Sequence, residues 1–126
     1  MGIKKTILFI DDNPVDRTFI DRLLTKYNFN VLLAEDGIVG LRMAQEKAID
    51  LILLDILLPH ISGIELCKNL KTNPATKDIP VIFYTSIDTP KNMIVYTTYG
   101  AQDYIQKGMP PQELIASIKS ILNLES

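Results

Sequence analysis

The chain alternates short apolar runs with longer stretches in which apolar residues recur every three or four positions. The most continuous run is Leu51–Leu54, four large aliphatic residues with no polar position between them. A strand without a polar face is typical of a parallel strand that is covered on both sides. Five strands are expected on this basis, at residues 6–10, 31–34, 51–54, 80–85 and 103–107. The last is of mixed polarity, which indicates an edge of the sheet.

Helical spacing of apolar residues follows each of these strands. Asn13 before Pro14, with Asp16 as an acid in the first turn, is a typical helix start, and Ser62 with Glu65 has the form of a capping box. The buried faces are expected to include Phe19 in the first helix and both Ile38 and Ala48 in the second. The predicted helices cover, approximately, residues 14–27, 36–48, 62–72, 89–100 and 111–122.

Strict alternation of strands and helices predicts an α/β fold, because right-handed crossovers make successive strands parallel. The three fully apolar strands belong at the centre of the sheet. A flavodoxin-like, doubly wound, five-stranded parallel sheet of order 2-1-3-4-5 with five helices satisfies this requirement. At 126 residues, with no repeat or linker, the chain is expected to be one domain over residues 1–126.

Charge and composition narrow the classes of partner. Lys and Arg total 13 against 15 Asp and Glu, which gives no electrostatic footprint for nucleic acid or for an anionic membrane. No apolar run approaches the roughly 20 residues that cross a bilayer, and the first residues lack a signal-peptide core. We therefore expect a cytoplasmic protein whose partners are proteins or small molecules. The single Cys67 is expected to be a packed thiol.

Polar residues follow the central strands. Asp11 and Asp12 come after the first strand, Asp55 after the third, Thr85 ends the fourth, and Lys107 ends the fifth. The carboxyl ends of parallel strands share one edge, where ligands of such sheets bind. Carboxylates this close repel one another by about 4 kcal/mol per pair at an effective dielectric near 20, so a hard cation such as Mg²⁺ is expected. A Mg²⁺ ion bound by so few protein groups typically also binds a phosphate. No glycine motif that would hold a nucleotide polyphosphate is present, so the phosphoryl group is expected to come from another molecule.

These residues, at these spacings, resemble the receiver domain of bacterial two-component response regulators. The resemblance rests on Asp11-Asp12, on Asp55 within Asp-x-x-Leu-Pro, on Thr85-Ser86 and on the segment from Gly100-Ala101 to Lys107. It implies a chemotaxis-regulator-like fold over essentially the whole chain. It also implies that Asp55 takes a phosphoryl group from a histidine kinase or phosphotransfer protein.

The resemblance assigns a role to each matching residue. Asp12, Asp55 and the backbone carbonyl of Leu57 would bind Mg²⁺, with Asp11 acting mostly through a bound water. Thr85 and Lys107 would contact the phosphoryl oxygens. Tyr104 would turn inward as Thr85 moves, and a downstream protein, unidentified by the sequence, would read the face formed by the fourth helix, fifth strand and fifth helix. A homodimer is left open. No enzymatic turnover is expected beyond self-phosphorylation from small donors and self-dephosphorylation.

The sequence departs from the family where the bulky residues Tyr96 and Tyr99 precede Gly100, and at two positions after Lys107. Gly108 replaces the proline that usually follows the lysine, and we expect a trans bond there. Pro110 replaces the acid that usually caps the last helix. Leu57 and Ile87, which flank the phosphoryl position in the family, cannot orient an attacking water, so slow self-dephosphorylation is predicted.

Two other functions are considered. One is a Mg²⁺-dependent phosphohydrolase with an aspartyl nucleophile, which usually needs a second acid two residues after the nucleophile, where this chain has Leu57. The other is a degenerate receiver that binds partners without phosphorylation, and the complete set of acids argues against it.

Overall fold

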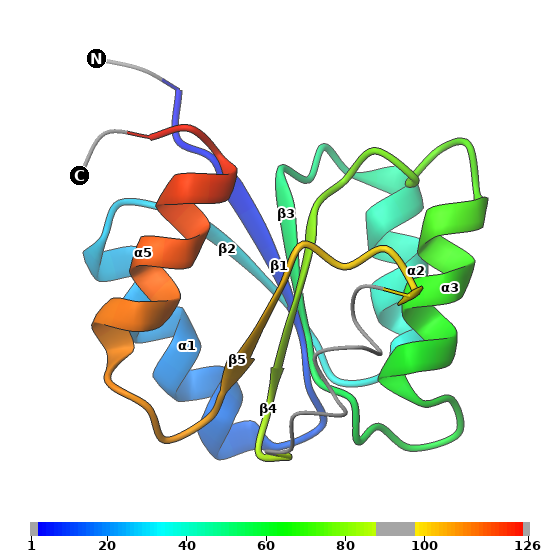
Figure 1. The fold of residues 1–126 in the computed structure, drawn as a ribbon, viewed down its shortest axis with the longest axis horizontal. Helices are drawn as coiled ribbons and strands as arrows, with labels where there is room; N and C mark the ends of the chain where they lie inside the picture. Colours follow the sequence, from blue (N-terminus) through cyan, green and yellow to red (C-terminus); the bar gives the residue numbers. More distant parts are fainter. Residues whose placement is uncertain (1–2, 88–97, 125–126) are drawn as a thin grey trace.

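In the computed structural model, which describes residues 3–87 and 98–124, a single sheet lies between two layers of helices (Figure 1). All neighbouring strands are parallel, and the sheet order is β2-β1-β3-β4-β5. The strands are β1 (Thr6–Ile10), β2 (Asn30–Ala34), β3 (Leu51–Leu54), β4 (Val81–Thr85) and β5 (Asp103–Gln106). The predicted fold class and strand order are confirmed.

In the described part of the chain, helices cover both faces of the sheet (Figure 1). The helices are α1 (Pro14–Lys26), α2 (Gly37–Glu46), α3 (Gly63–Thr72) and α5 (Pro111–Ile121). Helices α1 and α5 lie on one face, and α2 and α3 lie on the other. The remaining predicted helix, at 89–100, falls largely on residues 88–97, which lie outside the described residues. Within the described part of the chain, no helix has the length and apolarity to cross a membrane.

The core divides according to the alternation of side chains along the strands. Phe9 and Leu53 point towards α1 and α5, where they meet Ile20 and other apolar residues. Ile10 and Leu54 point the opposite way, into the cluster formed with α2 and α3. Every residue of β3 and β4 is buried, whereas β5 is only half-buried along its length. The central and edge positions assigned from apolar content are thus correct.

The helix ends follow the predicted caps. The side chain of Asn13 accepts hydrogen bonds from the backbone N–H groups of Val15 and Asp16, and the Ser62 hydroxyl accepts one from Glu65. Pro110 stands at the start of α5 and gives no side-chain cap. These contacts fix where α1 and α3 begin, immediately beyond the carboxyl edge of the sheet.

The buried faces of two helices differ from the prediction. Ile38 is 59% exposed, and Ala48 lies beyond the end of α2 at Glu46. Gly40 faces the sheet instead, and a Cβ on it would lie 2.5 Å from Cδ1 of Ile10. Because the close approach of α2 to β1 uses a residue without a side chain, a count of apolar positions misses it. In α1, Phe19 was also expected on the buried face, but it is 45% exposed.

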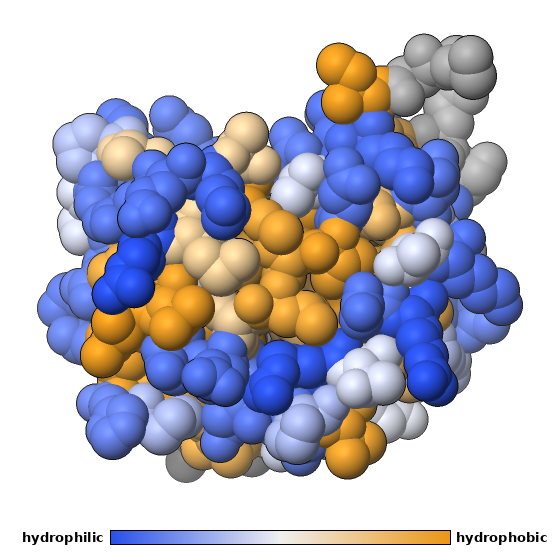
Figure 2. Space-filling model, turned by 180° about the vertical axis from the view of Figure 1, so that it is seen from behind, coloured by the Kyte–Doolittle hydropathy of each residue, from blue (hydrophilic) through white to orange (hydrophobic). Residues whose placement is uncertain are grey.

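The face seen from behind carries an apolar area across its middle, bordered by hydrophilic side chains (Figure 2). The edge strand β2 lies on this distant side in Figure 1. Its residues Val31, Leu32 and Leu33 are only half-buried. The β2 edge of the sheet is therefore more apolar than an edge strand usually is.

Candidate functional site

The sheet register sets the first two acids side by side. Ile10 of β1 pairs with Leu54 of β3, so Asp11 and Asp55 each follow a paired residue. The N–H of Asp11 donates to the carbonyl of Ala34 at 3.0 Å, and the N–H of Asp55 donates to the carbonyl of Ile10 at 3.1 Å. Backbone hydrogen bonds therefore hold both residues at the carboxyl edge, as predicted.

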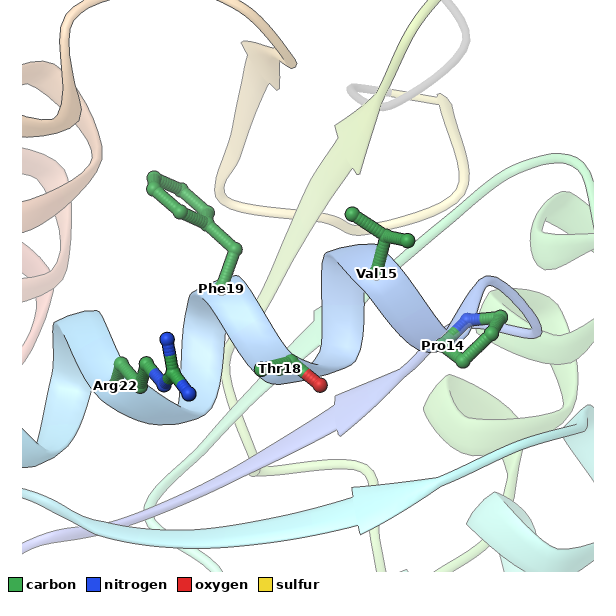
Figure 3. A pocket seen from close by; sticks show the side chains of 5 residues that line it. All are labelled: Pro14, Val15, Thr18, Phe19 and Arg22. Atoms are coloured by element: carbon green, nitrogen blue, oxygen red, sulfur yellow. The ribbon is translucent and has the colours of Figure 1, made fainter.

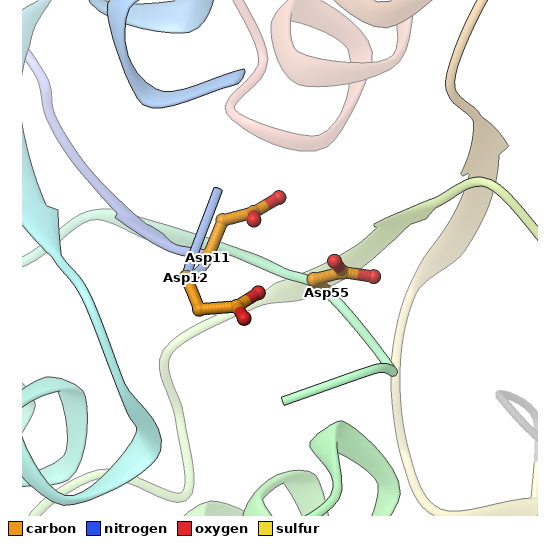
Figure 4. A group of neighbouring side chains, drawn as sticks. All are labelled: Asp11, Asp12 and Asp55. Carbon is orange, nitrogen blue, oxygen red and sulfur yellow. The ribbon is translucent and has the colours of Figure 1, made fainter. Parts of the chain in front are cut away.

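Three carboxylates gather at this edge (Figure 4). One oxygen each from Asp11, Asp12 and Asp55 lies within 4.8 Å of the others. Asp11 is fully buried, Asp55 is 5% exposed, and Asp12 is open to solvent. A set of oxygen ligands with one open side has the chemistry of a site for a hard divalent cation.

Lys107 brings a positive charge into this group. Its backbone N–H donates to the carbonyl of Thr85 at 2.7 Å, which extends the pairing of β4 and β5 by one residue. Its ammonium nitrogen lies 2.5 Å from Oδ2 of Asp11, 2.7 Å from Oδ2 of Asp16 and 3.2 Å from Oδ2 of Asp55. Three N–H donors thus meet three carboxylates, and the lysine is saturated.

Burial and ion pairing act in opposite directions on the pKa values. Burial raises the pKa of Asp11, although its hydrogen bonds with Lys107 and Asn13 partly oppose this. For Lys107, burial lowers the pKa, but the hydrogen bonds to Asp11 and Asp16 and the charge of Asp55 outweigh it and raise the pKa above 10.5. Lys107 is therefore a fixed cation at neutral pH.

Asp16 is the residue that sequence reasoning missed. It was interpreted only as an acid in the first turn of a helix, where it favours the helix dipole. In the structure it points to the end of β5, and its side chain is 31% exposed. The sequence did hold a signal for this role, because Asp16 lies one turn after the Asn13 cap, on the helix that follows the acid pair.

The fourth strand contributes a buried hydroxyl and a link to an aromatic residue. Thr85 is fully buried, and its Oγ1 accepts a hydrogen bond from the N–H of Ile87 at 3.5 Å. The Tyr104 hydroxyl donates to the carbonyl of Ile87, and its ring centroid lies 6.4 Å from that of Phe83. Tyr104 is thus connected to the segment that follows Thr85.

The loop after β3 is held close to the acids. The N–H of Leu57 donates to Oδ1 of Asp55 at 3.3 Å, and the Leu57 side chain is exposed. At Gly63, a Cβ would lie 2.0 Å from the carbonyl oxygen of Asp55. After Lys107 the peptide bond is trans, as expected, and Gly108 has a φ of +90°, which glycine adopts without strain.

An apolar hollow lies on α1 beside the acids (Figure 3). Val15 and Phe19 project from the same side of the helix, and they are 74% and 45% exposed. Pro14, Thr18 and Arg22 complete the lining. Because α1 begins only two residues after Asp12, this surface borders the opening of the acid group.

Known proteins are similar to this chain in sequence and in fold. The model of the response regulator receiver domain family matches residues 7–119. The phosphate regulon transcriptional regulatory protein PhoB of Pseudomonas aeruginosa is 39% identical over 120 residues, which cover 95% of this chain and 52% of that protein. The chain spans about half the length of this and similar curated regulators.

Solved structures agree with the sequence comparison. A CheY-like response regulator receiver domain protein from Methanospirillum hungatei JF-1 is 28% identical, with a TM-score of 0.86 over 96% of this chain and 95% of that one. The receiver domain of sensor histidine kinase PA1611 from Pseudomonas aeruginosa PAO1, described with magnesium in its active-site cleft, is 26% identical, with a TM-score of 0.87 over 96% and 99% of the two chains. The present chain belongs to the response regulator receiver domain family of two-component systems.

Proposed function

We propose that Asp55 of this receiver accepts a phosphoryl group from a histidine kinase or a histidine phosphotransfer protein. The observation that supports this most directly is the convergence of Asp55 with two further acids and one ammonium group at a single edge of the sheet. The carboxylate of Asp55 is 5% exposed, so it is shielded from bulk water yet close to the open side formed by Asp12.

The acids fit a magnesium ion. Their three oxygens lie within 4.8 Å of one another, and each is a hard ligand of the type that Mg²⁺ prefers. Asp12, Asp55 and the carbonyl of Leu57 would bind the ion, with Asp11 acting through water. When bound, Mg²⁺ would offset the negative charge of the phosphoryl oxygens.

The residues of the chain itself would carry the transfer. A carboxylate oxygen of Asp55 forms a bond to phosphorus as the phosphorus–nitrogen bond of the donor phosphohistidine breaks. The departing imidazole nitrogen keeps the electron pair of the broken bond, and an acyl phosphate remains on Asp55. Lys107 and the hydroxyl of Thr85 would then contact the phosphoryl oxygens. Tyr104, which reaches the carbonyl of Ile87, would respond to the movement of Thr85.

The donor protein must bring its histidine to the carboxyl edge of the sheet. The exposed apolar side chains of Val15 and Phe19 border that edge, and an aliphatic surface of the donor would cover them. The signal would leave through the face that includes β5 and α5, towards a downstream protein in the cytoplasm. The product is a shift in conformational population, and no substrate is turned over beyond self-phosphorylation and self-dephosphorylation.

Incubation with Mg²⁺ and acetyl phosphate, followed by intact-mass measurement, tests this function. The expected result is one added phosphoryl group in the wild-type chain and none in Asp55→Asn. Release of inorganic phosphate without an adduct would instead support a phosphohydrolase. An unchanged mass with no release would support a receiver that binds partners without phosphorylation.

A further inference from the structure

The contact between Lys107 and Asp16 has no part in the proposed transfer. Asp16 lies outside the three-acid group, and it comes from α1 rather than from a strand end. Yet its Oδ2 is 2.7 Å from the Lys107 ammonium nitrogen, closer than the Oδ2 of Asp55 at 3.2 Å. The ammonium group therefore lies nearer to the acid of the helix than to the proposed phosphoryl acceptor.

The contact with Asp16 matters because it occupies one of the three N–H donors of the Lys107 ammonium group. An ammonium group has three N–H donors, and all three are used by Asp11, Asp16 and Asp55. A phosphoryl group on Asp55 can receive a hydrogen bond from Lys107 only if one of these donors turns away from its present acceptor. The donor now aimed at Asp55 could pass to its phosphoryl group, but the contact with Asp16 draws the ammonium group towards α1, and Asp16, unlike Asp11, has no part in the group that would hold the metal.

We propose that Asp16 is a positioning residue that competes with the phosphoryl group for Lys107. In the unmodified receiver it holds the ammonium group towards α1, and it lowers the stability of the phosphorylated form relative to a receiver without this acid. This inference rests on the proposed function. The Lys107 side chain is 14% exposed and that of Asp16 is 31% exposed, so the ion pair is only partly screened by solvent.

Beryllium fluoride provides an equilibrium test, because it adds to an aspartate carboxylate as a trifluoroberyllate group that resembles a phosphoryl group. Its half-saturation concentration on the full chain is measured by NMR with saturating Mg²⁺. The Asp16→Asn variant is expected to require about two- to sixfold less beryllium fluoride than the wild type, the range of a partly exposed ion pair. Asp21→Asn, on the same helix, is the matched control and should leave the value unchanged, since among the described residues its side chain accepts a hydrogen bond only from the Thr25 hydroxyl.

A double-mutant comparison separates competition for Lys107 from loss of a nearby negative charge. In a Lys107→Met background, Asp16→Asn should have no further effect on the half-saturation concentration. An equal effect in both backgrounds, no effect in either, or weaker binding by Asp16→Asn would overturn the inference. Thermal unfolding of each variant with Mg²⁺ verifies that it is folded. If the wild type itself takes no beryllium fluoride, the proposed function fails first, and this outcome is distinct from a failure of the role of Asp16.

Discussion

Replacing Lys107 by methionine tests how the acids are held together in the absence of metal. The ammonium group pairs with three carboxylates, two of which are nearly or fully buried. Removing one partner of a buried ion pair typically destabilises a protein by about 3–5 kcal/mol. We expect about 3 kcal/mol near neutral pH, the lower end, because the side chain of Asp16 is 31% exposed and is partly solvated after the change. For a chain of this size the loss lowers Tm by about 10 °C.

The pH dependence of the stability loss in Lys107→Met shows whether the loss comes from the unpaired carboxylates. Burial raises the pKa of Asp11 in the folded state, and the loss of Lys107 removes the contact that opposes this rise. A raised acid pKa favours the folded state at low pH, and this advantage is lost as the pH rises through the folded pKa. The deficit of Lys107→Met should therefore shrink on going from about pH 7 to about pH 4.5. In the wild type, the raised pKa of Lys107 keeps its ammonium group charged at every pH below 10.5, so Lys107 itself does not titrate between these two pH values.

Urea unfolding at these two pH values, with and without Mg²⁺, is the assay. Mg²⁺ should restore much of the lost stability near neutral pH, because a ligand that binds the folded acids stabilises them. Lys119→Met is the matched control: its ammonium nitrogen lies 5.5 Å from the Tyr27 ring centroid, away from the acids, and its small effect should not change with pH or metal. A Lys107→Met chain as stable as the wild type without metal, or a deficit equal at both pH values, would refute the reasoning.

Four further substitutions test other parts of the account. Gly63→Ala should destabilise the chain by at least about 2 kcal/mol in urea unfolding, because the added Cβ would lie 2.0 Å from the backbone oxygen of Asp55. Gly108→Ala should lose only about 1 kcal/mol, because no atom lies within 4 Å of its added Cβ and the cost comes from the φ of +90° alone. Asp11→Asn should raise stability near neutral pH by about 1 kcal/mol by removing a buried charge, and the gain should vanish as acid protonates the wild-type group. Leu57→Asn, which introduces a polar group beside Asp55, should shorten a phosphoryl lifetime that we expect to exceed a few seconds by far in the wild type; an unchanged lifetime would contradict this.

The sequence was sufficient to predict the sheet and the edge that carries the site. Three strands without a polar face had to be central, and the doubly wound order 2-1-3-4-5 fits this requirement and places Asp11 and Asp55 next to each other. The same reasoning placed Lys107 at that edge. These predictions succeeded because burial on both faces of a parallel strand leaves a strong compositional signal.

The spacing of apolar residues did not predict the contacts that depend on how a helix is rotated about its axis. Ile38 was expected to be buried, but the turn of α2 that faces the sheet presents Gly40 to Ile10. Asp16 was interpreted as a first-turn acid, because sequence spacing does not show that α1 aims it at the end of β5, 91 positions along the chain. A hydrophobic stripe defines a helix face only within about one residue, and a polar partner across the fold requires finer knowledge than that.

The identity of the modified residue tests the central claim most directly. An acyl phosphate on aspartate is reduced by borohydride to homoserine, which marks the residue in a peptide mass spectrum. After treatment with Mg²⁺ and acetyl phosphate, the account predicts homoserine at position 55 and at no other acid. Homoserine at position 11, 12 or 16, or phosphorylated protein with no reducible aspartate, would contradict it.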